Sequence, residues 1–67
     1  MITDRDVWTS ANVLLKHHGE GAPLYAVQQA DALLEAGDME GLAVWKRILR
    51  AVQELQREQP AEGQARH

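Results

Sequence analysis

Two adjacent histidines, His17 and His18, are the residues whose type most readily suggests metal chemistry. Neighbouring residues on a helix point about 100° apart, so this pair cannot chelate one ion as histidines four residues apart can. We therefore predict no metal site and no cofactor. We interpret both histidines as helix-end residues that favour the helix dipole, with a pH-sensitive contact as the alternative.

Groups that could perform catalysis are few. The hydroxyl nucleophiles other than Tyr25 are Thr3, Thr9 and Ser10, and the chain has no cysteine. Thr3 suits a helix cap, Ser10 has no histidine at helical spacing, and no phosphate-binding or metalloprotease motif is present. We expect no catalytic residues and predict that the chain is not an enzyme.

Basic residues gather on one predicted helix, in a chain whose net charge is −3. The stripe consists of Lys46, Arg47, Arg50 and Arg57. Such a stripe is typical of a solvated face, partly paired through Arg50 and Glu54 at i,i+4 spacing. A phosphate-binding surface for nucleic acid is a second interpretation, although nucleic-acid-binding domains usually carry a net positive charge. An acidic protein partner is a third.

Apolar residues outside the predicted core stripes indicate a protein-interaction surface. Leu24 and Tyr25 fall off the core stripe of their helix, whereas Val52 and Leu55 lie in the last turns of a longer helix that overhangs its neighbours. Exposed apolar groups of this kind favour self-association or a protein partner. The predicted surface is therefore Leu24, Tyr25, Val52 and Leu55.

The helices that position these residues are separated by glycine and proline residues. Three helices are predicted, over Thr3–His18, Pro23–Ala36 and Met39–Glu58. Gly37 and Asp38 form a two-residue joint, so the second and third helices make an antiparallel hairpin. The third helix measures about 30 Å at about 1.5 Å per residue, which is longer than its partners.

The predicted fold is an all-α, compact three-helix bundle. Residues 1–58 form the single domain, and residues 59–67 form a flexible tail after Pro60. Its core is predicted around Trp8, Leu15, Leu34, Trp45 and Ile48. Small residues within the apolar arcs, Ala11, Ala26, Ala30 and Gly41, let the helix backbones approach closely.

No apolar run approaches the roughly 18 residues of a membrane span. No signal-like stretch is present either, so we expect a soluble cytoplasmic protein without a membrane partner.

In the order of its motifs, the chain resembles a family of small, all-helical bacterial proteins of unknown function. The shared pattern begins at His18-Gly19-Glu20, continues through Ala30-Asp31 and Gly37-Asp38, and ends at Val44-Trp45-Lys46-Arg47-Ile48. The resemblance covers roughly residues 4–57. It implies a single helical domain and supplies no catalytic or binding residue.

Together these observations favour a non-catalytic protein-interaction module, with a homodimer as one form of it. A small nucleic-acid-binding regulator that uses the basic stripe is the alternative.

Overall fold

The structure, a computed structural model, describes residues 3–58. It contains α1 (Asp4–His18), a 3-10 turn η1 (Gly19–Gly21), α2 (Ala22–Ala36) and α3 (Met39–Glu58). No strand occurs within residues 3–58, which confirms the all-α prediction. The predicted helix boundaries differ from the observed ones by at most one residue. The predicted tail, residues 59–67, lies outside the described residues.

Short polar side chains and glycines set the helix ends. The Thr3 hydroxyl accepts a hydrogen bond from the backbone N–H of Asp6, and the Thr3 N–H donates to the Asp6 carboxylate, both at 3.2 Å. This capping box satisfies two groups that would otherwise lack partners at the start of α1. Gly19 and Gly37 follow α1 and α2 with φ of 57° and 78°, a region that favours glycine.

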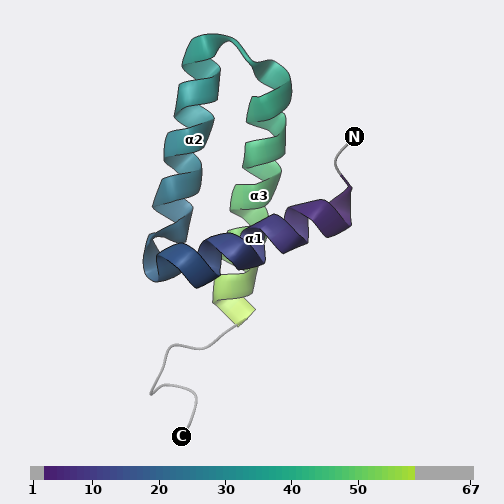
Figure 1. The fold of residues 1–67 in the computed structure, drawn as a ribbon, viewed down its shortest axis with the longest axis vertical. Helices are drawn as coiled ribbons and strands as arrows, with labels where there is room; N and C mark the ends of the chain where they lie inside the picture. Colours follow the sequence, from purple (N-terminus) through teal and green to yellow (C-terminus); the bar gives the residue numbers. More distant parts are fainter. Residues whose placement is uncertain (1–2, 59–67) are drawn as a thin grey trace, which may run out of the picture.

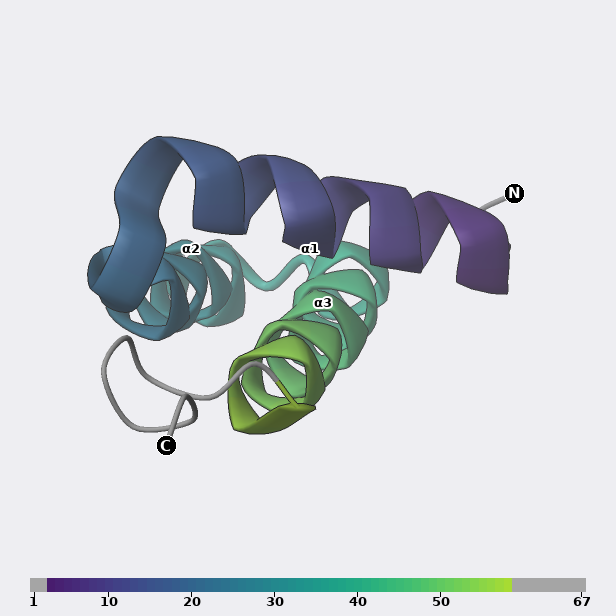
Figure 2. The ribbon, with the colours of Figure 1, turned by 90° about the horizontal axis from the view of Figure 1, so that it is seen from below.

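α2 and α3 form an antiparallel hairpin, and α1 crosses one side of it near the base (Figure 1). The view from below shows α1 above both helices, so the opposite side of the hairpin is not covered by α1 (Figure 2). The arrangement therefore differs from the bundle predicted from sequence, in which three helices run alongside one another. α1 joins α2 through the short turn η1 and crosses the hairpin rather than following its length (Figure 1).

The core lies where α1 crosses α3. Val7, Ala11 and Leu14 repeat at helical spacing along one side of α1 and are buried together with Ala22 of α2 and with three residues of α3, Ile48, Ala51 and Val52. Ala26 and Ala30 are also buried on α2. Alanine at these positions lets helix backbones approach closely, as predicted for Ala11, Ala26 and Ala30.

Gly41 is the fourth of the predicted close-approach residues, and the structure supports its role. A Cβ atom at this position would lie 2.8 Å from Asp38 Oδ2 and 3.2 Å from Leu33 Cδ2. Asp38 is held there as the N-cap of α3, since its Oδ1 accepts a hydrogen bond of 2.9 Å from the Gly41 N–H.

The predicted core is only partly correct. Ile48 is buried, while Leu15 and Trp45 are partly buried against the core. Trp8 and Leu34 were wrongly placed, because they are 42% and 54% exposed. Trp8 lines an open groove together with residues of α3, and Leu34 lies in the last turn of α2, next to the hairpin turn.

Candidate interaction surface

The side of the hairpin opposite α1 exposes apolar side chains from both of its helices. We call this surface the hairpin face and define it as Val27 and Leu34 of α2 with Leu42 and Leu49 of α3. Val27 and Leu34 are 38% and 54% exposed, and Leu42 and Leu49 are half-buried. In each helix the two residues are seven positions apart and so lie on the same side.

The helix periodicity places these residues away from α1. On α3, Ala51 belongs to the core shared with α1, and Leu42 and Leu49 lie about 180° and 160° from it at 100° per residue. On α2, Tyr25 stacks on His18 of α1, and Leu34 and Val27 lie about 180° and 160° from Tyr25. The four residues therefore share the side of the hairpin that α1 leaves uncovered.

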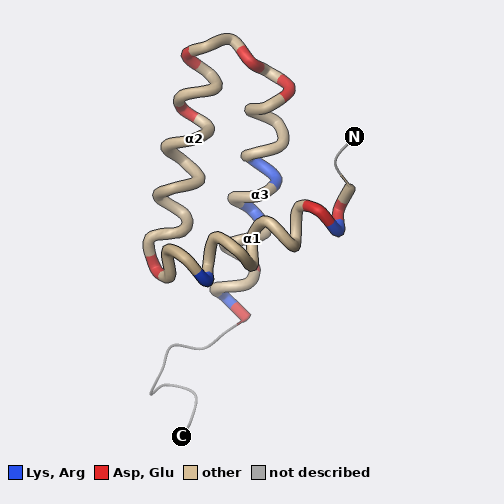
Figure 3. Tube along the Cα trace, viewed as in Figure 1, with Lys and Arg blue, Asp and Glu red and all other residues tan. Residues whose placement is uncertain are grey.

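Charges of opposite sign border the hairpin face. Asp31 and Glu35 are exposed along the outer side of α2 and form its acidic edge. Lys46 and Arg50 are exposed on the outer side of α3 and form its basic edge. Figure 3 shows the acidic residues toward the hairpin turn and the basic residues farther along α3. The face is thus an apolar strip with a negative and a positive border.

A shallow depression adjoins the hairpin face on the acidic edge. It is lined by Leu34, Ala32, Asp31 and Glu35. A long side chain with an apolar stem and a cationic end suits such a lining, because the stem can contact Leu34 while the charge meets the carboxylates.

A second hollow lies between α1 and α3 and shares Arg50 with the basic edge. This open groove has a volume of about 440 Å³ and is lined by Trp8 together with five residues of α3, Arg47, Arg50, Ala51, Glu54 and Glu58. Arg47 donates to Asp4 Oδ1 at 2.6 Å, and Arg57 donates to Glu54 Oε2 at 2.5 Å. Two of the charged groups in the groove are therefore already paired within the chain.

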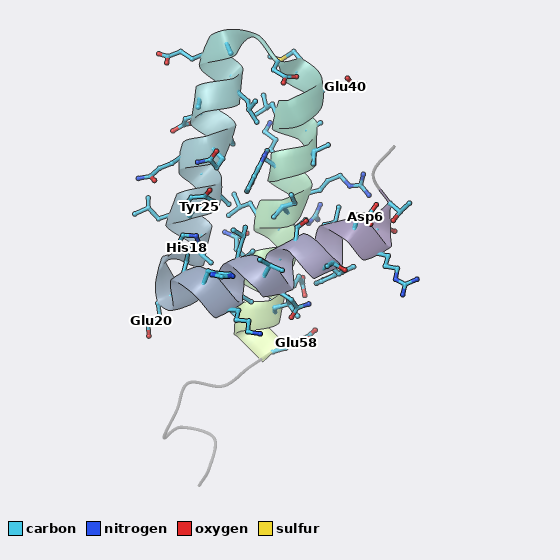
Figure 4. The ribbon with its side chains drawn as sticks, viewed as in Figure 1. Asp6, His18, Glu20, Tyr25, Glu40 and Glu58 are labelled. Atoms are coloured by element: carbon cyan, nitrogen blue, oxygen red, sulfur yellow. The ribbon has the colours of Figure 1, made fainter. Side chains whose placement is uncertain are left out.

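An aromatic stack joins the three helices at the base of the hairpin. The rings of His18 and Tyr25 are stacked with centroids 4.3 Å apart, and the Tyr25 ring meets Trp45 edge-on at 6.1 Å. Figure 4 shows His18 and Tyr25 side by side where α1 turns into α2. His18 therefore has a packing role that the sequence did not reveal, whereas no such contact involves His17.

Of the four apolar residues predicted to form the interaction surface, only Leu24 is freely exposed, at 62%. Tyr25 is half-buried in the aromatic stack, and Leu55 is partly buried against the core. Val52 is fully buried, so its prediction as a surface residue is wrong. The end of α3 extends past its crossing with α1 (Figure 1), but Val52 lies in the core that α3 shares with α1 and is covered there.

The basic stripe predicted on α3 is divided in the structure. Arg47 is turned toward α1 and paired with Asp4, and Arg57 is paired with Glu54. The predicted pair of Arg50 with Glu54 is therefore replaced by the pair of Arg57 with Glu54. Within residues 3–58, Lys46 and Arg50 take part in no ion pair and remain as the basic edge.

Neither a metal-ligand cluster nor a membrane-spanning helix occurs within residues 3–58. No cluster of three or more His, Asp or Glu side chains able to hold a metal ion occurs there. None of the three helices combines the length and the apolar character needed to cross a membrane.

The comparison with protein families identifies the chain. A family model described as "Family of unknown function (DUF6961)" matches residues 3–60, which include every described helix. The chain belongs to this family. Membership agrees with the expected resemblance to a domain of unknown function. No match was found among curated proteins or among solved structures.

Proposed function

We propose that this member of the family is a non-catalytic protein-interaction module that binds through the hairpin face. The observation that carries the proposal is the exposure of Val27 and Leu34 on a side of the hairpin that no described element covers. Apolar strips with polar borders are typical of protein-binding surfaces.

The composition of the core supports the proposal. Nine apolar residues are buried among those described, and five of them are alanines: Ala11, Ala22, Ala26, Ala30 and Ala51. The largest side chain that is fully buried is Val52. Small domains whose cores bury little apolar surface commonly gain stability from oligomerisation or partner binding. Covering the hairpin face would add apolar burial at about 25 cal/mol per Å².

Nucleic acid is the less favoured partner. Two of the four arginines and lysines of the predicted stripe are paired with carboxylates, and the chain carries a net charge of −3. Binding to phosphates would rest on Lys46 and Arg50, beside an apolar strip that phosphates do not require. We also propose that the protein is bacterial, as the family resemblance implies, and that it acts in the cytoplasm.

Site-specific photo-crosslinking in the source organism tests the proposed function. A photoreactive phenylalanine analogue replaces Leu34 on the hairpin face or Val13, an apolar residue of α1 that is 48% exposed. We expect a protein adduct from position 34 and none from position 13. Absence of an adduct at position 34, or equal adducts at both positions, would contradict the proposal.

A further inference from the structure

We propose that the partner on the hairpin face is a second copy of this chain, related by a two-fold axis that runs along the length of the hairpin. The inference rests on the proposed function and specifies its partner. It follows from the distribution of apolar and charged residues on this one face.

A two-fold axis in this direction places α2 of one copy over α3 of the other. At about 1.5 Å per residue, Leu34 and Leu42 lie roughly 5 and 7 Å from the turn at Gly37 and Asp38. Val27 and Leu49 lie roughly 16 and 17 Å from it. Leu34 therefore meets Leu42 of the second copy, and Val27 meets Leu49, with a mismatch of about one residue. Both contacts occur twice, as the symmetry of an isologous interface requires.

The charged borders match under the same rotation. The acidic edge of one copy faces the basic edge of the other, with Asp31 roughly 10 Å and Lys46 roughly 13 Å from the turn. Side chains lean toward the N-terminus of their helix, so Asp31 leans away from the turn and Lys46 toward it. The two side chains thus converge across the interface. Within one copy they lie on opposite edges of the hairpin and form no ion pair.

The depression beside Leu34 extends the match of the charged borders. Its lining of Leu34, Asp31 and Glu35 faces the basic edge of the second copy, where Lys46 and Arg50 have no ion-pair partner within the described residues. Lys46 of the second copy, the nearer of the two in this register, can lay its stem along this apolar lining and place its charge beside Asp31. The hairpin face thus carries both the acidic residues and the basic residues that the interface requires, which favours self-association over binding of a different protein.

A charge exchange measured by analytical ultracentrifugation tests the arrangement. We expect the parent chain to dimerise, and Asp31→Lys and Lys46→Asp each to raise the dimer dissociation constant roughly tenfold, because each turns two attractions into two repulsions. Combining both substitutions restores the opposite charges, and we expect an affinity close to that of the parent. The control is Glu20→Lys, which makes the same charge change on the exposed turn η1 and should leave the affinity unchanged.

Two results would overturn the inference: a parent chain that stays monomeric, or a double variant no tighter than the single variants. The crosslinking experiment distinguishes a failure of this inference from a failure of the proposed function. A monomeric chain that is crosslinked to another protein at position 34 rejects the second copy and keeps the interaction module. A monomeric chain without an adduct rejects both.

Discussion

At the scale of single residues, the type of a side chain did not decide its role. Trp8 and Trp45 are both apolar-arc tryptophans in the sequence, yet Trp45 is packed against the core and Trp8 is 42% exposed beside the α1–α3 groove. His17 and His18 are neighbours, yet only His18 is stacked on Tyr25. For the tryptophans the difference depends on where another helix passes, which a helical wheel does not contain.

The tryptophan pair gives a first prediction. Trp45→Ala should lower the free energy of unfolding by about 3 kcal/mol, because it removes a large packed side chain and the edge-on contact with Tyr25. Trp8→Ala should cost about 1 kcal/mol or less, since much of that side chain is in water. Thermal unfolding followed by circular dichroism measures both. Equal losses in the two variants would show that the two tryptophans are buried alike.

The histidine pair gives a second prediction. His18→Ala should destabilise the chain by about 1 kcal/mol, the usual range for a stacked aromatic pair. His17→Ala, one residue earlier and exposed like His18 but outside the stack with Tyr25, serves as the matched control and should change stability by less than about 0.5 kcal/mol. A neutral His18→Ala would show that the stack contributes nothing to the fold.

At the scale of elements, the sequence predicted the helices well because their ends depend on local chemistry. Thr3 caps α1, Gly37 ends α2 in the left-handed region, and Asp38 caps α3, all by contacts within a few residues. The sides that the helices bury were predicted less well. Leu34 has the spacing of a core residue, but only two helices are present at its end of the hairpin.

The turn between α2 and α3 gives a third prediction. Gly41→Ala should fail to provide the gain of about 1 kcal/mol that alanine normally brings to a helix. The added methyl group would meet the Asp38 carboxylate, which is fixed as the N-cap, and the Leu33 side chain. We expect unchanged or reduced stability in denaturant unfolding. A clearly more stable variant would contradict the close contact at Gly41.

The cap itself can be tested separately. Asp38→Ala should cost about 1 kcal/mol, since it removes the hydrogen bond to the Gly41 N–H at the start of α3. Asp38→Asn keeps an acceptor oxygen and should recover most of this loss. If both variants were equally unstable, the charge of Asp38 rather than its capping bond would be responsible.

At the scale of the whole molecule, the sequence predicted that apolar residues of α2 would be exposed, but not which side of the hairpin α1 leaves uncovered. An excess of apolar residues on α2 and α3 indicated self-association, and Leu24 was correctly predicted to be exposed. Val52 was misplaced because comparing helix lengths assumes that the helices run side by side, whereas α1 crosses α3 and buries it. The hairpin face can be recognised only once the position of α1 is known, because α1 covers one side of the hairpin and leaves the other side open.

The most direct test of the central claim is the solution mass of the parent chain, Leu34→Glu and Val13→Glu by light scattering, over a roughly hundredfold range of concentration. Both substitutions place the same charge on an exposed apolar residue, but only Leu34 lies on the hairpin face. We expect the parent and Val13→Glu to reach the mass of a dimer as concentration rises, and Leu34→Glu to remain a folded monomer. A parent chain that is monomeric throughout, or a Leu34→Glu variant that dimerises like the parent, would contradict the claim that this face binds a second copy.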